Sequence, residues 1–175
     1  MSSGAIQKVM GIRPLTAGDI SAVTSIFNEA VSSEETTCDI QPRTEEQMKS
    51  WLTGDLPKYE SYVFEKDNEI LGWAAITRYH EREAYSPTTE LVTFVRRAAR
   101  NKGIGGELMR LVLRRAREIE FHSAVCIVFP EPAHILDAIR RLGFQELGRL
   151  HAVFPTSTGF RDVVLFQLFL AERLR

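Results

Sequence analysis

The most constraining feature of this sequence is a strand, a glycine-rich loop and a helix in direct succession. "TTELVTFV" has the β-branched and apolar residues typical of a buried strand, and "RRAARNKGIGG" follows it as a loop. The helix "ELMRLVLRRAREIEF" comes next. Its mostly apolar stripe consists of Leu108, Leu111, Val112, Arg115 and Ile119. A helix with one buried face beside a strand indicates an α/β fold, in which helices pack on a sheet.

The N-terminal half predicts a strand, two helices and a hairpin. After the short strand "GIRPL", Thr16 and Asp19 form a capping-box pattern that starts a helix running to about Val31. Thr44 and Gln47 repeat the pattern at a second, short helix. "SYVFEKDNEILGWAAITRYH" then reads as two antiparallel strands, because the Asp and Asn of "KDNE" tolerate the backbone angles of a tight turn.

The C-terminal part completes the sheet. "HSAVCIVF" is a buried-type strand, and "AHILDAIRRLGF" is a helix closed by Gly143. Two further strands flank "PTSTG". The predicted order is βααβββαβαββ, a mixed sheet with helices on its faces.

Length and composition favour one domain. With 175 residues, 44% of them hydrophobic, the chain can fill one core, which we place at residues 11–170 after an N-terminal extension of residues 1–10. Lys and Arg total 22 against 23 Asp and Glu, so no surface for nucleic acid is expected. The apolar runs are far shorter than the roughly 20 residues of a membrane helix.

The N-terminus and the cysteines point to an intracellular protein without metal. "MSSGAIQKVMG" lacks the basic start and long apolar run of a secretory signal, which predicts a cytoplasmic protein. Cys38 and Cys126 have no CxxC or Cys/His spacing, so neither a disulfide framework nor a zinc site is expected. The four histidines also lack metal-ligand spacing.

The segment Arg100–Gly106, "RNKGIGG", has the chemistry of an anion site. It lies where a strand ends and a helix begins, so unpaired backbone N–H groups and the helix dipole converge there, and its glycines let a phosphate approach. The string lacks the Lys-Ser/Thr pair of a Walker loop and the spacing of a dinucleotide fingerprint. A pyrophosphate is therefore the expected guest, and a plain strand-to-helix turn is the alternative.

"RNKGIGGEL" resembles the acetyl-CoA loop of the GNAT superfamily of N-acetyltransferases, Arg/Gln-x-x-Gly-x-Gly/Ala. From about Gly11 to Leu168, the pieces "IRPLTAGDI", "IFNEAV", "PRT", "AYSPTTELVTFV", "RLGF" and "FRDVVLFQL" resemble the phosphinothricin/methionine-sulfoximine acetyltransferase branch in content and order. The resemblance implies the GNAT fold, with a mixed, mostly antiparallel sheet of about seven strands and helices on both faces, and acetyl-CoA as cosubstrate. The implied cofactor-binding residues are Phe94, Val95, Arg100, Asn101, Lys102, Gly103, Ile104, Gly105 and Gly106.

The resemblance also implies the catalytic residues. Glu90 matches the branch's Thr-Val-Glu segment and is expected to be the general base; a surface ion pair is the alternative. Backbone N–H groups around Phe94 and Val95 are the expected donors to the acetyl oxygen. The loop before Glu90 is expected to line the acceptor pocket. Its candidate substrate-binding residues are Arg82, Tyr85, Thr88 and Thr89.

Several positions depart from the branch. The Asn-x-x-Ser at the start of the fourth helix and the Tyr or His before "GF" are replaced by Pro132, Ile135 and Ile139, so side chains expected to hold pantetheine and to protonate the thiolate are missing. The branch's Phe-Arg becomes Tyr79-His80, and its Gly-Arg-Trp becomes Thr158-Gly159-Phe160. These changes make phosphinothricin itself a doubtful substrate.

The expected function is acetyl transfer to the primary amine of a small molecule, an amino acid or an analogue, by a protein that the resemblance implies is a homodimer. A protein N-acetyltransferase is a second reading, although nothing in the sequence favours the groove that a peptide needs. A CoA-binding regulatory module with decayed catalysis is a third, because of Pro132 and Ile139. Enzymatic turnover separates the first reading from the third.

Overall fold

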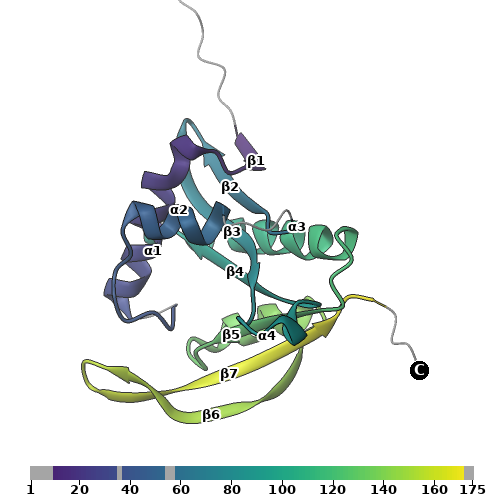
Figure 1. The fold of residues 1–175 in the computed structure, drawn as a ribbon. Coiled ribbons are helices and arrows are strands. Elements are labelled where there is room, and N and C mark those ends of the chain that lie inside the picture. Colours follow the sequence, from purple (N-terminus) through teal and green to yellow (C-terminus); the bar gives the residue numbers. More distant parts are fainter. Residues whose placement is uncertain (1–9, 35–36, 54–57, 172–175) are drawn as a thin grey trace, which may run out of the picture.

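The computed structural model describes residues 10–34, 37–53 and 58–171, which form a twisted sheet flanked by helices (Figure 1). Its strands are β1 Met10–Pro14, β2 Ser61–Lys66, β3 Glu69–Arg78, β4 Thr88–Val95, β5 Ser123–Val128, β6 Gln145–Thr156 and β7 Gly159–Phe169. Its α-helices are α1 Ile20–Ser33, α2 Glu45–Thr53, α3 Ile104–Glu118 and α4 Ala133–Arg141. The predicted order of elements is confirmed.

The described strands form one seven-stranded sheet in the order β1-β2-β3-β4-β5-β7-β6. All neighbours are antiparallel except β4 and β5, which are parallel. The mixed, mostly antiparallel sheet is therefore as expected. The single parallel pair separates the sheet into an N-terminal half, β1 to β4, and a C-terminal half, β5 to β7.

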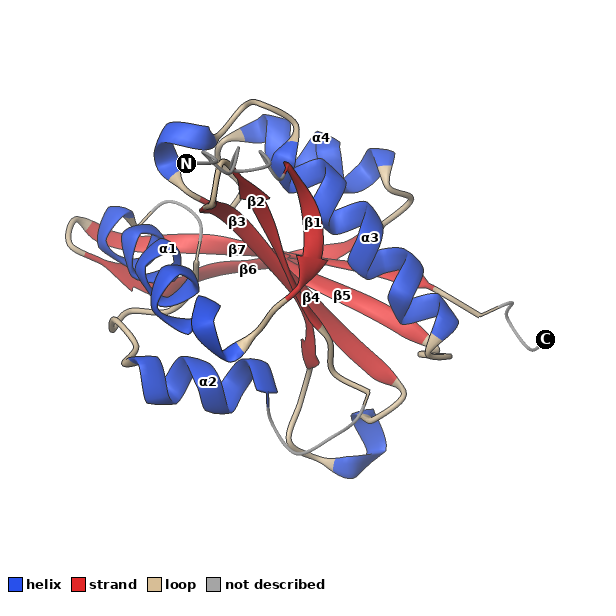
Figure 2. Cartoon of the chain, turned by 90° about the horizontal axis from the view of Figure 1, so that it is seen from above, coloured by secondary structure: helices blue, strands red, loops and turns tan. Residues whose placement is uncertain are grey.

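Helices cover both faces of the sheet: α1 and α2 lie on one side, and α3 and α4 on the other (Figure 2). Each face has its own apolar core. The core under α1 and α2 includes Phe27, Met48 and Trp73, all fully buried. The core under α3 and α4 includes Leu108 and Val112 of α3, which are fully buried as the helical stripe predicts.

Local sequence signals explain the turns. Thr44 N–H donates to Gln47 Oε1 at 2.9 Å, and Gln47 N–H donates to Thr44 Oγ1 at 3.2 Å, which is the predicted capping box of α2. Asp67 and Asn68 have φ angles of 53° and 65°, which fit the tight turn expected between β2 and β3. Gly143 follows α4 with a φ of 96°, as a helix-ending glycine does.

Two boundaries differ from the sequence expectation. We expected α3 to begin after the glycines, but it begins at Ile104, inside the loop, because Gly103 takes the left-handed conformation that ends the turn one step earlier. Residue 10 was assigned to the N-terminal extension, but Met10 pairs with Lys66 in the sheet. The rest of that extension, residues 1–9, lies outside the described residues.

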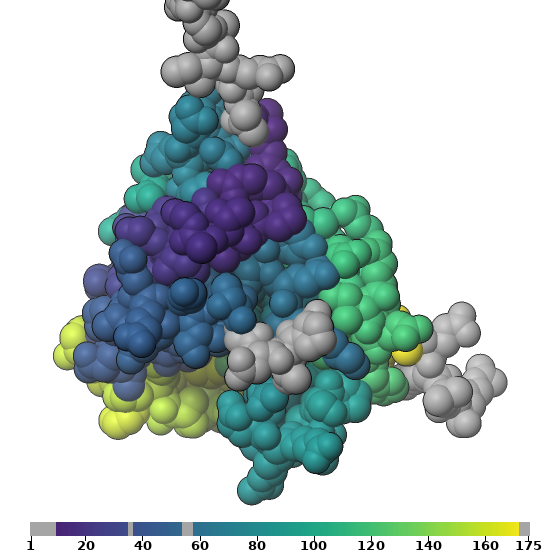
Figure 3. Space-filling view, turned by 45° about the horizontal axis from the view of Figure 1, so that its top comes forward, coloured from purple at the N-terminus to yellow at the C-terminus, as the bar shows by residue number. Residues whose placement is uncertain are grey.

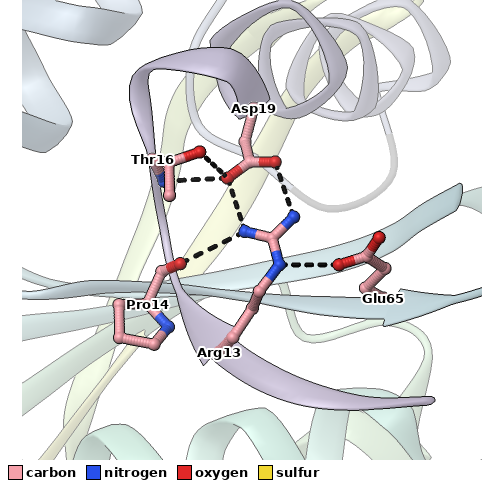
Figure 4. Close-up of polar contacts among 5 residues, drawn as sticks. All are labelled: Arg13, Pro14, Thr16, Asp19 and Glu65. Carbon is pink, nitrogen blue, oxygen red and sulfur yellow. Dashed lines mark hydrogen bonds and ion pairs between the residues drawn. The ribbon is translucent and has the colours of Figure 1, made fainter. Parts of the chain in front are cut away.

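Arg13 joins β1, β2 and the start of α1 through one charged cluster (Figure 4). Its guanidinium donates to both carboxylate oxygens of Asp19, at 2.7 and 2.9 Å, and to Glu65 at 2.6 Å. Asp19 also accepts the Thr16 N–H at 2.8 Å, the predicted contact of the first capping box. The Arg13 guanidinium holds the pKa of the Asp19 carboxyl at about 2, below its usual 3.8.

Asp19→Asn should lower the free energy of unfolding at pH 7 by about 1 to 2 kcal/mol. This is less than the full pKa shift of Asp19 would correspond to, because Arg13 is partly exposed and solvent screens the ion pair. The pKa of Asp19 is lower in the folded state, so its contribution is present above pH 3.8 and is lost as the pH falls toward 2. Urea unfolding of both proteins should therefore show a gap at pH 7 that closes near pH 2. Asp137→Asn, at an exposed site of α4, is the control, and a gap that persists at pH 2 would contradict this account.

Candidate active site

A wedge opens in the middle of the sheet, between β4 and β5. These strands pair only from Thr88↔Ser123 to Glu90↔Val125, although β4 continues to Val95 and β5 to Val128. β5 stays paired with β7 along its length. The strands therefore separate directly after Glu90, and a cavity of about 370 Å³ lies between them, α3 and α4.

The backbone of β4 presents N–H groups to this wedge. The Arg96 N–H donates to Leu71 O at 2.8 Å, and β3 and β4 keep an unbroken antiparallel register. Because the hydrogen-bonding direction alternates along a strand, the N–H of Phe94 points toward β3, whereas those of Thr93 and Val95 point toward the wedge. Val95 thus fits the expected donor role, Phe94 does not offer its N–H, and Thr93 is a donor that sequence reasoning missed.

The side chain of Glu90 faces the opposite layer from the cavity's helical wall. Side chains alternate along β4: Leu91 belongs to the core under α3 and α4, whereas Val92 and Phe94 belong to the core under α1 and α2. Glu90 shares the direction of Val92 and Phe94, and it lines the cavity where the strands separate. The Glu90 carboxyl can therefore be approached by an acceptor from the α1/α2 face of the sheet, while the cavity opens toward α3 and α4.

Glu90 has the protonation behaviour of a base at neutral pH. Burial and, to a smaller extent, the charge of Asp39 raise the pKa of its carboxyl, Arg43 lowers it, and the result is a pKa of about 7. Within the described residues, the carboxylate accepts no hydrogen bond and forms no ion pair within contact distance, so the surface ion pair considered from the sequence is not present there. The side chain is half-buried and can accept a proton.

The glycine loop leads into the helix dipole of α3. Gly103 has a φ of 85°, and the first helical hydrogen bond runs from Glu107 N–H to Gly103 O at 3.1 Å. The N–H groups of the three residues before Glu107 therefore lack a partner within the helix. An added Cβ at Gly103 would meet no atom within 4 Å, so this turn faces open space. The arrangement fits a pyrophosphate at the N-terminus of α3.

Cations surround the loop. Arg100 lines the cavity and donates from Nε to Val95 O at 3.2 Å. Arg110, which sequence reasoning missed, reaches back along α3, since a Cβ at Gly106 would lie 3.4 Å from its Nη1. Arg110 lies one helical turn after Gly106, and no motif marks it, so only the geometry of α3 relates it to the loop. Lys102 does not line the cavity; its Nζ donates to a backbone carbonyl of the preceding turn at 3.1 Å.

The cavity brings most of the expected residues together. Those lining it are Glu90, Phe94, Val95, Arg100, Asn101, Gly103, Ile104, Gly105 and Gly106. The expected acceptor residues do not line it. Thr89 is fully buried and donates to Thr77 O at 2.7 Å, and Thr88 Oγ1 lies 3.0 Å from Ser123 Oγ, so both hydroxyls are used within the sheet.

Arg82 and Tyr85 belong to the loop before β4, which projects from the surface (Figure 3, teal). Tyr85 is 42% exposed, and its ring lies 4.7 Å from that of His80. The Arg82 N–H donates to His80 Nδ1 at 3.0 Å, which fixes the loop but leaves the guanidinium outside the cavity.

The wall formed by α4 is mainly apolar. Pro132, His134, Ile135 and Ile139 line the cavity, and Ile139 is buried. The missing Asn, Ser and Tyr are thus replaced by hydrocarbon. Cys126, interpreted from the sequence as an ordinary thiol, is also on the wall; its Sγ donates to Leu91 O at 3.7 Å, and burial raises the pKa of the thiol.

Two further observations concern the described part of the chain. None of its helices is long and apolar enough to cross a membrane. No three His, Cys, Asp or Glu side chains within it are grouped so that they could hold a metal ion.

Comparison with known proteins identifies the family. Residues 23–144 match the family described as acetyltransferase (GNAT) family. The phosphinothricin N-acetyltransferase of Streptomyces coelicolor is 28% identical over 161 residues, which cover 89% of this chain and 94% of that protein. The L-methionine sulfoximine/L-methionine sulfone acetyltransferase of Pseudomonas paraeruginosa is 26% identical over 161 residues, with 91% and 94% covered.

The fold has a solved counterpart. The crystal structure of a GNAT superfamily phosphinothricin acetyltransferase from Sinorhizobium meliloti in complex with AcCoA superposes with a TM-score of 0.87, at 24% identity, covering 94% of this chain and 90% of that one. The expected fold is therefore confirmed. Because the family match spans most of the chain, this protein belongs to the GNAT family of acetyltransferases.

Proposed function

We propose that this acetyltransferase transfers the acetyl group of acetyl-CoA to the primary amine of a small molecule, an amino acid or an analogue, with Glu90 as general base. The observation that carries the proposal is the position of Glu90, a carboxyl with a pKa of about 7, at the point where β4 and β5 separate. The relatives named for phosphinothricin and methionine sulfoximine support a small, amino-acid-like acceptor.

Acetyl-CoA, when bound, supplies an acetyl thioester. The free N–H groups of the α3 N-terminus, with Gly105 and Gly106, are the proposed pyrophosphate contacts, and Arg100 and Arg110 add positive charge. Asn101, Lys102 and Ile104 complete the loop. The apolar α4 wall, with Pro132 in place of Asn, is proposed to pack against the cofactor and not to hydrogen-bond with it.

The residues of β4 perform the transfer in this proposal. Glu90 accepts a proton from the acceptor's ammonium group, so that the neutral amine can form its bond to the acetyl carbon. The N–H groups of Thr93 and Val95 point toward the wedge and stabilise the negative charge on the acetyl oxygen. When the C–S bond breaks, the nitrogen loses its second proton to water and the thiolate takes a proton from water, since Ile139 stands where the branch has Tyr or His.

We also propose a cytoplasmic homodimer. Support for the dimer comes from β6, an edge strand of the sheet whose Leu147, Leu150 and Val153 are 59%, 49% and 49% exposed. Sedimentation velocity distinguishes a dimer from a monomer.

The experiment that tests the function is an acetyl-transfer assay. A panel of L-amino acids, simple amines and a peptide with a free N-terminus is incubated with acetyl-CoA, and thiol release is followed. Transfer to small amines, with little to the peptide, supports the proposal. Transfer to the peptide alone favours the protein N-acetyltransferase reading, and acetyl-CoA binding without transfer favours the regulatory module.

A further inference from the structure

A cation that acetyl transfer itself does not require lies on the Glu90 side of the sheet. Arg43 is in the connection between α1 and α2, directly before the capping residue of α2. Arg43 and its neighbour Asp39 act on the pKa of Glu90 in opposite directions, so both lie within electrostatic reach of that carboxylate.

The position of Arg43 is fixed by several contacts. Asn28 of α1 binds its backbone twice, because Asn28 Nδ2 donates to Arg43 O and Arg43 N–H donates to Asn28 Oδ1, both at 2.9 Å. The guanidinium lies 4.0 Å from the centre of a Trp51 ring and 5.0 Å from that of Phe27. Phe27 in turn contacts Phe94 of β4, edge to face, at 5.2 Å. Aromatic rings thus connect Arg43 to the strand of Glu90.

The guanidinium keeps free hydrogen-bonding capacity. Its contact with an acidic side chain is a single one, from Nη2 to Asp39 Oδ1 at 3.1 Å. Within the described residues, Nε and Nη1 have no acceptor. The side chain is 26% exposed, so a ligand can reach it. A preorganised arginine with two free donors is suited to a carboxylate, which accepts a pair of parallel hydrogen bonds.

Arg161 is a further arginine near the α1–α2 connection, within electrostatic reach of Cys38, and it makes more contacts than Arg43 does. Its guanidinium donates to the backbone oxygen of Glu34, lies 3.7 Å from the carboxylate of Glu131 and stacks on Phe129 at 3.9 Å. These contacts tie the β6–β7 hairpin to the end of α1. Arg43 is therefore the better candidate for binding a ligand.

We infer that Arg43 determines acceptor selectivity by binding an anionic group, a carboxylate, carried next to the amine that Glu90 deprotonates. The inference rests on the proposed function, because it needs an amine at Glu90. It assigns the recognition of the acceptor to Arg43, on the α1/α2 face of the sheet toward which the side chain of Glu90 points; neither Arg43 nor Arg82 lines the cavity between β4 and β5.

The test compares two acceptors that differ only in the carboxylate: L-methionine sulfone and 3-(methylsulfonyl)propan-1-amine, each with acetyl-CoA and the full chain. Wild type should prefer the amino acid. Arg43→Gln should lower kcat/KM for the amino acid by about 10- to 100-fold, mainly through KM, as expected for a lost charge-assisted pair, and change it less than about threefold for the amine. The kcat/KM of Arg43→Lys for the amino acid should lie between those of wild type and Arg43→Gln, because lysine keeps the positive charge but lacks the paired donors of the guanidinium.

Asp39→Asn should change kcat/KM for the amino acid in the opposite direction. It frees the guanidinium, so kcat/KM for the amino acid should rise by about threefold or more relative to the amine. Arg114→Gln, an exposed arginine of α3, is the matched control and should change neither acceptor. If Arg43→Gln does not fold by circular dichroism, Asp39→Asn and Arg43→Lys decide.

The possible outcomes distinguish a failure of this inference from a failure of the proposed function. If the Arg43 variants lose kcat/KM equally for both acceptors, or if Asp39→Asn changes kcat/KM equally for both, then Arg43 only supports the aromatic cluster. Either result overturns the inference. Transfer to amines without a preference for the carboxylate overturns the inference and leaves the proposed function standing. Absence of transfer to any amine overturns both.

Discussion

Glu90→Gln should reduce turnover by roughly 10²- to 10⁴-fold, the usual contribution of a general base. The amide keeps the shape of the side chain but cannot accept a proton from the acceptor. Affinity for acetyl-CoA should barely change, because the side chain of Glu90 faces α1 and α2 and the glycine loop lies on the other side of the wedge. Steady-state kinetics with a competent acceptor and calorimetry with acetyl-CoA measure the two quantities.

The fold of this variant should be intact. Because burial raises the pKa of Glu90 to about 7, ionising the carboxyl costs stability as the pH rises from about 4.5 through 7. Glu90→Gln should therefore unfold at the same temperature as wild type, or a higher one, at pH 8. Glu81→Gln, in the exposed loop before β4, is the control for turnover. Wild-type turnover by Glu90→Gln would remove the carboxylate from the mechanism.

Gly105→Glu should weaken acetyl-CoA binding by about 100-fold or more. A Cβ at this position lies 3.4 Å from Val95, at the wall of the cavity, and the added carboxylate would compete with a pyrophosphate for the same N–H groups. The helix should persist, since an acidic residue in its first turn favours the helix dipole. Isothermal calorimetry measures the loss, and circular dichroism checks the helix content.

The same substitution elsewhere controls for charge and bulk. At Gly148 on β6, an added Cβ meets no atom within 4 Å, so Gly148→Glu should leave acetyl-CoA affinity unchanged. Gly105→Ala adds a methyl group at ordinary contact distance and should cost far less than the acid. If Gly105→Glu binds acetyl-CoA as wild type does, the loop is a turn and not the cofactor site.

The order of elements and most of the cofactor cavity were predictable because their signals are local. Capping residues such as Thr44 and Gln47 bond within one turn of chain, and the Asp67-Asn68 turn needs no distant partner. The glycine loop is likewise contiguous in sequence, so its place between a strand and a helix could be inferred from the pattern. The start of α3 at Ile104 was missed because the pattern places Gly103 in the loop but does not give its backbone angles.

The remaining parts of the site depend on distant segments. The wedge exists because β4 and β5 stop pairing after Glu90, and no residue pattern in either strand predicts where the pairing ends. Arg43 reaches the Glu90 side only through the packing of α1 and α2 on the sheet. The resemblance places the loop with Arg82 and Tyr85 at the acceptor pocket; this loop lies outside the cavity between β4 and β5, and its role in binding the acceptor stays a prediction.

The most direct measurement of the central claim is the pH dependence of kcat/KM for wild type and Glu90→Gln with one competent amine. The wild-type profile should rise with pH through an ionisation near 7, because Glu90 must be unprotonated to act as a base and burial places its pKa there. The Glu90→Gln profile should lack that ionisation and rise only as the acceptor amine itself loses its proton. Two superimposable profiles would contradict the assignment of Glu90 as the base.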